Sequence, residues 1–186
     1  FDSIRHYSNF AIERLSTENR YNELFTLLLE KIRKDGEVLR HPSEMKWYMD
    51  FMVNPLLENE ENAKTIKSKS IFYFINGTVY FITGNLEKAF YYYQKDIEHL
   101  ENESKNTPIE SSLYSAKISN MCAVCLKKGD SKTLSFYLEK LRNCPANFPM
   151  EKSKSFYRYY DLLIKSYILT GEFDKAIDLY HSIKNE

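Results

Sequence analysis

The chain has 186 residues, and its 26 lysines and arginines balance its 26 aspartates and glutamates, so its formal net charge is zero. This balance argues against general nucleic-acid binding by this segment, because binding through counterion release needs a basic surface excess. An apolar content of 43% and an aromatic content of 15% indicate a packed core rather than disorder. Five glycines and five prolines are too few for the turns of an all-β fold. We therefore expect an all-α protein built from long helices.

The sequence carries no membrane or export signal that we can recognise. No apolar run approaches the roughly 20 residues of a transmembrane helix, and no charged and then apolar leader opens the chain. Three cysteines, an odd number, do not form a disulfide framework and fit a reducing compartment. We expect a soluble, cytoplasmic protein that has no membrane partner. Because it begins at Phe1, inside an apolar-periodic segment, we expect it to be part of a longer chain.

Apolar residues at helical spacing define the expected elements in chain order. A helix pair around Asn19 opens the chain, and a stripe that includes Trp47 and Phe51 predicts an extra helix that Pro55 kinks or ends. Residues 58–62 read as a solvated acidic loop, 107–110 as a capping box and 143–149 as a turn. The predicted helices cover residues 2–17, 20–34, 43–57, 63–83, 86–103, 108–128, 131–142, 150–170 and 173–184.

A repeat organises these helices. Gly84, Gly129 and Gly171 each stand between two apolar-periodic runs, and they lie 45 and 42 residues apart. A glycine at such a place predicts a helix that stops at a left-handed residue, followed by a second helix two residues later. We expect a single helical-repeat domain over 1–186, with units at 2–34, 63–103, 108–142 and 150–184.

The unit that begins near Ser70 resembles a tetratricopeptide repeat. Six of its residues stand where that family has core aromatics, small residues at the helix crossing and the turn glycine: Tyr73, Gly77, Tyr80, Gly84, Ala89 and Tyr93. The resemblance implies a right-handed α-α superhelix, or solenoid, of antiparallel helix pairs. It also implies a concave groove, lined by the first helix of each pair, that holds a peptide or a partner helix.

The other units resemble the family less closely. The last keeps Tyr160, Leu163, Tyr167, Phe173, Ala176 and Tyr180 at the corresponding places, but has Ile164 where a small residue is usual. The middle unit has Ile118, Met121, Cys122, Cys125, Leu134 and Leu138, and the first has Ala11, Ile12, Leu15, Leu24 and Leu28. The spacing of 42–45 residues exceeds the family's usual unit of about 34. It resembles the tetratricopeptide-like sensor domains of bacterial regulators.

No arrangement of residues indicates catalysis. Cys122 and Cys125 have a spacing that suits a metal or redox pair, but both fall on core positions and nothing completes a tetrahedral site, so we favour structural burial. The histidines, His6, His41, His99 and His181, fall in separate units. We expect a protein that is not an enzyme and has no cofactor and no metal.

Two further patterns have ordinary structural explanations. Asn76-Gly77-Thr78 and Asn102-Glu103-Ser104 match the glycosylation acceptor pattern, but the first lies inside a predicted packed helix, and we treat both as chance matches. The run from Phe90 to Tyr93 offers a stacking platform for bases, yet at least Phe90 and Tyr93 belong to the core stripe. We favour helix packing for this run.

The candidate binding surface is the first-helix groove. Its apolar centre and its polar, basic flank comprise Ile71, Phe74, Thr78, Phe81, Ile82, Arg158, Asp161 and Lys165, followed by Ile168 and Leu169. Such a surface suits a hydrophobic segment or an amphipathic helix of a protein partner. The alternative is that the 43–57 helix fills the groove from within. The family's clamp for acidic C-termini is absent, because its places carry Asn9, Thr78, Ala123 and Lys165.

Two functions fit these features. The first is a protein or peptide interaction scaffold that uses the groove. The second is a ligand- or peptide-responsive regulatory domain of a bacterial transcription or signalling regulator, in which ligand binding shifts the curvature of the solenoid. Self-association is a further open alternative. The sequence does not identify the partner.

Overall fold

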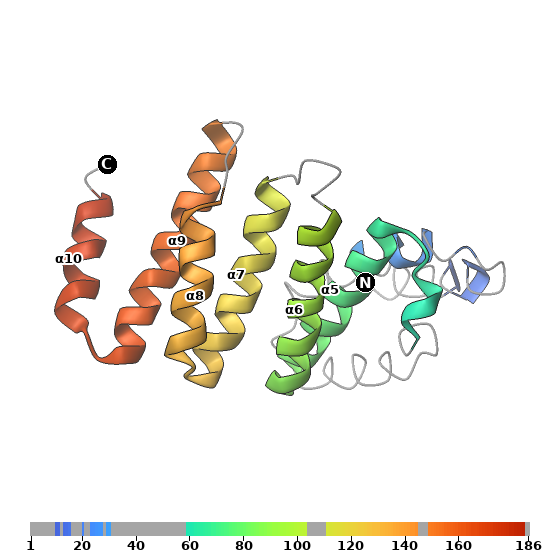
Figure 1. Cartoon of the computed structure of the whole chain (residues 1–186), viewed down its shortest axis with the longest axis horizontal. Helices are drawn as coiled ribbons and strands as arrows, with labels where there is room; N and C mark the ends of the chain where they lie inside the picture. Colours follow the sequence, from blue (N-terminus) through green and yellow to red (C-terminus); the bar gives the residue numbers. More distant parts are fainter. Residues whose placement is uncertain are drawn as a thin grey trace. The chain divides into compact units, whose positions relative to one another are not determined.

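The computed structural model of the chain describes residues 10–11, 13–15, 20, 23–27, 29–30, 59–103, 111–144 and 149–184. The predicted helix at 43–57 and the predicted capping box at 107–110 lie outside these residues. The described part is all-helical, and its helices pack against their neighbours (Figure 1). The elements from residue 60 onward are the 3-10 helix η1 (Glu60–Asn62) and the α-helices α5 (Ile66–Ile82), α6 (Leu86–Glu103), α7 (Ser111–Lys128), α8 (Ser131–Arg142), α9 (Pro149–Thr170) and α10 (Phe173–Lys184).

Helix bounds agree closely with those that apolar periodicity predicts. The bounds of α6, α8 and α10 coincide with the predicted 86–103, 131–142 and 173–184, and α9 begins one residue early. The prediction of an acidic loop at 58–62 is wrong in part, because Glu60–Asn62 forms a 3-10 turn. The side chain of Asn59 caps this turn by accepting a hydrogen bond from the Glu61 amide.

Left-handed glycines end three of the helices, as the sequence predicts. Gly84, Gly129 and Gly171 have φ angles of 84°, 72° and 78°, a region that costs a residue with a Cβ about 1–2 kcal/mol. After Gly129, the side chain of Asp130 accepts a hydrogen bond from the Thr133 amide and starts α8. Each glycine therefore ends one helix two residues before the next begins.

The chain divides into two compact units, Phe1–His99 and Leu100–Glu186, and the boundary falls inside α6. In the first unit, the core joins the early segment to α5. The Phe25 and Phe72 rings meet edge to face at 6.1 Å, and Phe72 meets Tyr92 of α6 in the same way. The buried core residues of this unit include Leu24, Phe25, Ala63, Ile71, Phe72, Tyr73, Ile75 and Val79.

The close approach predicted at Gly77 is confirmed. A Cβ built on Gly77 of α5 would lie 2.5 Å from Cδ1 of the Tyr93 ring, on α6. Ala89, the other small residue expected at this crossing, is fully buried. A buried hydrogen bond from the Ser70 hydroxyl to the Asp96 carboxylate, 2.9 Å long, links the same two helices. The crossing of α5 and α6 therefore depends on the absence of a side chain at Gly77 and on the hydrogen bond between Ser70 and Asp96.

In the second unit, α7 packs against both α8 and α9, and α8 also packs against α9. α10 packs against α9, at the end of the series in Figure 1. All six core residues predicted for the middle unit are buried: Ile118, Met121, Cys122, Cys125, Leu134 and Leu138. Among the described residues, we find no helix whose length and apolar character would let it cross a lipid bilayer.

Candidate binding surfaces

The predicted groove residues of the first unit lie on α5, but they are not equally accessible. Ile71 is buried in the core, and the Thr78 hydroxyl shares a 3.1 Å hydrogen bond with the Tyr93 hydroxyl. The Phe74 ring lies beside Tyr93, with centroids 6.4 Å apart, and is half-buried. Phe81 and Ile82 are also half-buried. The half-buried Phe74, Phe81 and Ile82 are the apolar side chains of this set that retain exposed surface.

The predicted groove residues of the second unit lie on α9. The Arg158 guanidinium donates a 2.8 Å hydrogen bond to the Ser115 hydroxyl of α7, so it helps to hold these two helices together. Asp161 and Lys165 are exposed and form an ion pair of 2.6 Å one turn apart. Ile168 and Leu169, which follow them, are exposed. The two groups of predicted residues thus belong to different compact units.

A more exposed apolar surface, which sequence reasoning missed, lies on α10. Phe173, Ile177 and Tyr180 are 59%, 54% and 57% exposed. Their spacing of four and three residues places them on one side of the helix. We call these three residues the α10 stripe. The sequence assigned Phe173 and Tyr180 to core packing, but the structure leaves both exposed, and Ala176 is the α10 residue that is buried.

A charged row runs beside the α10 stripe. Asp174, Asp178 and His181 each follow a stripe residue by one position, so they form a parallel row about 100° around the helix. All three are exposed. The two aspartates give this row an acidic character. The stripe is therefore an apolar surface that has negative charge along one edge, and the exposed Lys184, four residues after Tyr180, lies at its C-terminal end.

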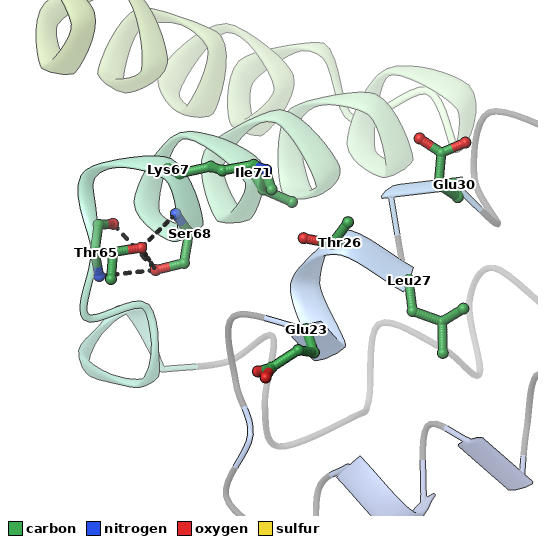
Figure 2. A pocket seen from close by; sticks show the side chains of 8 residues that line it. All are labelled: Glu23, Thr26, Leu27, Glu30, Thr65, Lys67, Ser68 and Ile71. Atoms are coloured by element: carbon green, nitrogen blue, oxygen red, sulfur yellow. Dashed lines mark hydrogen bonds between the residues drawn. The ribbon is translucent and has the colours of Figure 1, made fainter.

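A pocket of about 540 Å³ lies in the first unit, lined by Glu23, Thr26, Leu27 and Glu30 and by residues at the start of α5 (Figure 2). Several of its polar groups have partners. Glu23 pairs with Arg20 at 3.1 Å, and the Thr65 and Ser68 side chains hydrogen-bond one another and each other's backbone amide at the start of α5. The exposed Lys67 also lines this pocket.

Another pocket, of about 390 Å³, lies in the second unit where α8 ends and α9 begins. Its lining residues are Leu141, Arg142, Cys144, Ser155, Phe156, Tyr159 and Tyr160. Ser155 is only 8% exposed, and its hydroxyl is the one buried side-chain polar atom of the described residues that has no hydrogen-bond partner. No sequence motif points to this serine, because its isolation arises only when α8 and α9 pack together.

The two cysteines of α7 are buried, as predicted. Burial raises the pKa of the Cys122 thiol to about 12 and that of Cys125 to about 11, and the neighbouring Cys125 adds to the effect on Cys122. Thiolates, which bind metals and act as nucleophiles, are therefore disfavoured at neutral pH. Within the described ranges, no group of three or more His, Cys, Asp or Glu side chains is placed to hold a metal ion.

Several of the remaining candidates take structural roles where they are described, and others are exposed. Asn76 is 1% exposed and its amide donates to the Phe72 carbonyl, so a glycan has no access to it. Tyr93 is buried, while Phe90 is half-buried and Tyr91 is exposed. Tyr92 stacks on Tyr80 at 5.6 Å. His6 and His41 lie outside the described residues, whereas the His99 ring bonds the Ile66 carbonyl and His181 is exposed.

Comparison with known proteins gives no relative from which a function can be carried over. No family model, no curated protein and no solved structure matches the chain.

Proposed function

We propose that the chain is a protein interaction module: a helical-repeat scaffold of antiparallel pairs that binds an amphipathic helix of a partner protein and performs no catalysis. The observation that carries this proposal is the α10 stripe. Phe173, Ile177 and Tyr180 are each more than half exposed on one side of a short helix. Fully burying an exposed large apolar side chain contributes about 1.5–3 kcal/mol, so covering side chains that are a little more than half exposed contributes about half of that each, before the cost of association. Three of them at helical spacing suit a partner helix.

The charge beside the α10 stripe specifies the partner further. Asp174 and Asp178 line one edge, so the complementary helix carries lysine or arginine next to its own apolar residues. Phe173 and Tyr180 are aromatic, and aromatic side chains such as tyrosine often supply much of the binding energy of an interface. The expected ligand is therefore a basic amphipathic helix rather than an acidic tail.

Several features support the repeat architecture on which this proposal rests. Three left-handed glycines stand between helices at a spacing of 42–45 residues. The crossing of α5 and α6 uses Gly77, Ala89 and Tyr93, which are positions that the tetratricopeptide resemblance singled out. Stacked helix pairs of similar structure present extended helix surfaces to which a partner can bind. The first-helix groove of the sequence analysis remains the rival location for the binding surface.

A peptide selection tests the proposal. The immobilised chain is presented with a phage library of random 16-residue peptides, and the binders are measured by fluorescence anisotropy. We expect apolar residues at helical spacing with basic residues beside them. Ile177→Asp should weaken binding at least about tenfold, since it places a carboxylate in an apolar contact. Phe136→Asp is the matched control, because Phe136 of α8 is equally exposed and lies outside the stripe.

Three outcomes of this selection decide between the surfaces. Loss of binding in Ile177→Asp with retention in Phe136→Asp supports the α10 stripe. Loss in Phe81→Glu with retention in Ile177→Asp would move the site to the predicted groove. Equal binding by all three variants, each with a wild-type circular dichroism spectrum, would reject both surfaces.

The second candidate is the ligand- or peptide-responsive regulatory domain of a bacterial transcription or signalling regulator. The observation that favours it is the pocket at the α8–α9 junction, which contains a buried hydroxyl without a hydrogen-bond partner. A regulatory domain predicts that a small ligand alone changes the thermal stability of the chain. A pure scaffold predicts no such response.

A further inference from the structure

Ser155 is the most unusual polar group of the second unit. A buried hydroxyl without a hydrogen bond costs free energy, and native structures almost always satisfy such groups. Ser155 is 8% exposed, its Oγ has no partner among the described residues, and it lines the pocket of about 390 Å³ at the α8–α9 junction. A hydroxyl in this position can donate to, and accept from, a molecule that enters the pocket.

Three aromatic residues of α9, Phe156, Tyr159 and Tyr160, line this pocket beside its polar groups. Phe156 and Tyr160 lie one turn apart on α9 with ring centroids 4.4 Å apart, and Tyr159 meets Tyr160 edge to face at 5.1 Å. Leu141 of α8 adds an aliphatic surface. The volume lies at the lower end of the range for small-molecule sites, about 300–1,000 Å³. These walls suit a compact aromatic body.

Arg142 supplies a positive charge to the lining. Its guanidinium lies 3.9 Å from the Glu139 carboxylate, which is a long and solvent-exposed ion pair. The side-chain amide of Asn143 donates a 2.8 Å hydrogen bond to the other carboxylate oxygen of Glu139. Burial raises the pKa of the Tyr159 hydroxyl, and the nearby charge of Arg142 partly offsets that effect. Arginine binds carboxylates with two parallel hydrogen bonds, so a ligand carboxylate can compete well for Arg142.

We propose that the pocket at the α8–α9 junction binds a small carboxylate that has an aromatic body. Arg142 holds the carboxylate, the Ser155 hydroxyl hydrogen-bonds the buried part of the ligand, and Phe156, Tyr159 and Tyr160 cover the ring. This inference does not rest on the α10 stripe, because it uses none of the stripe residues, and it deepens the second candidate function, the ligand-responsive domain, by naming a ligand class for the same pocket. Free aryl acids and the C-terminal aromatic residue of a polypeptide share this chemistry.

The test is a titration of the whole chain with phenylacetate, followed by ligand-observed NMR. Benzyl alcohol provides the ring without the carboxylate, and acetate provides the carboxylate without the ring. We expect phenylacetate to bind at least about tenfold more tightly than either. N-acetylphenylalanine is the second arm. Tighter binding of N-acetylphenylalanine identifies a polypeptide end as the source of the ligand, and tighter binding of phenylacetate identifies a free acid.

Substitutions at the two polar groups separate recognition from folding. Arg142→Gln should weaken phenylacetate binding about tenfold, and Ser155→Ala about three- to tenfold. Ser155→Ala should melt at the same temperature as the wild type or higher, because it removes an unsatisfied buried hydroxyl. Glu139→Gln should tighten binding about two- to threefold by freeing Arg142. Lys132→Gln and Ser135→Ala, both exposed on α8, are the matched controls and should bind as the wild type does.

Cys144 offers an independent readout, because it lines the same pocket and is half-exposed. Saturating phenylacetate should slow alkylation of Cys144 by iodoacetamide, and it should do so less in Arg142→Gln. The proposal is overturned if phenylacetate does not bind. It is equally overturned if benzyl alcohol binds as tightly as phenylacetate, or if Arg142→Gln and Ser155→Ala both bind phenylacetate with wild-type affinity.

Discussion

Gly77 illustrates how a single residue determines a helix crossing in this protein. Alanine is a better helix former than glycine by about 1 kcal/mol, so propensity alone favours Gly77→Ala in the middle of α5. Packing opposes the change, because the new Cβ would lie 2.5 Å from a ring carbon of Tyr93, which is 4% exposed and has little room to move. Overpacking of this kind costs about 1–3 kcal/mol.

We therefore expect Gly77→Ala to lower the free energy of unfolding by up to about 2 kcal/mol in urea titrations, which is the overpacking cost less the gain in helix propensity. The matched double variant Gly77→Ala/Tyr93→Leu should lose less than the sum of the two single changes, since a smaller residue at 93 makes room for the Cβ. A stabilising effect of Gly77→Ala alone would show that the two helices do not meet at this point.

Glu101 is a residue whose protonation is linked to stability. Its carboxylate accepts hydrogen bonds from Tyr114 at 2.5 Å and from Lys140 at 2.7 Å, within the second unit. Partial burial tends to raise the pKa of Glu101, but the hydrogen bonds from Lys140 and Tyr114 and the charge of Lys140 hold it below its ordinary value of 4.5. The folded state therefore prefers the ionised carboxylate.

This preference fixes the sign of a pH effect. Because the folded pKa lies below the unfolded one, Glu101 adds stability above its unfolded pKa, and this contribution is lost as the pH falls through the folded pKa. We expect Glu101→Gln to reduce the free energy of unfolding by at most about 1 kcal/mol at pH 7, since the pair is one-third exposed. The difference from wild type should shrink at pH 3. Glu98→Gln, on the same helix, is the control, and an equal loss at both pH values would contradict the assignment.

For single residues, burial could be predicted from the sequence at some positions and not at others. Burial of Cys122, Cys125 and Asn76 could be predicted, because helical periodicity identifies the face on which a residue lies. The exposure of Phe173 and Tyr180 could not, because periodicity does not reveal whether another element covers that face. Ser155 carries no signal at all in the sequence, since an unsatisfied hydroxyl is a consequence of packing.

At the scale of elements, helix starts depend on local caps. Thr65 is the N-cap of α5: its hydroxyl accepts a hydrogen bond from the Ser68 amide at 3.1 Å, and the Ser68 hydroxyl accepts from the Thr65 amide at 2.9 Å. This reciprocal pair is a capping box in which serine replaces the usual glutamate or glutamine. Periodicity alone placed the start of this helix at residue 63, three residues early, because apolar spacing carries no information about which side chain caps the helix.

We expect Thr65→Ala to lower the free energy of unfolding by about 1 kcal/mol, the usual cost of losing an N-cap, whereas Thr65→Ser should cost little. Thermal unfolding monitored by circular dichroism measures both. If Thr65→Ala and Thr65→Ser melt at the same temperature as the wild type, the start of α5 is not determined by this cap.

At the scale of the whole molecule, much of the helical organisation could be predicted, because three glycines and the apolar stripes between them mark the helix ends. The bounds of α6, α8 and α10 follow from these marks to the residue. The binding surface could not be predicted in the same way. The tetratricopeptide resemblance predicts a binding surface in the first-helix groove. Two of the residues predicted there are not available to a partner in the same way, because Ile71 is buried and Thr78 is hydrogen-bonded to Tyr93. The most exposed apolar row of the described α9–α10 pair lies instead on a second helix, α10.

The central claim is that the α10 stripe binds a basic amphipathic helix. The most direct test is hydroxyl-radical footprinting of the chain with and without a peptide selected as a binder, read by mass spectrometry, because aromatic side chains react readily when exposed. We predict that the peptide protects Phe173 and Tyr180 from oxidation and leaves the equally exposed Phe136 unchanged. Unchanged oxidation of Phe173 and Tyr180, together with protection of Phe74 or Phe81, would contradict the claim.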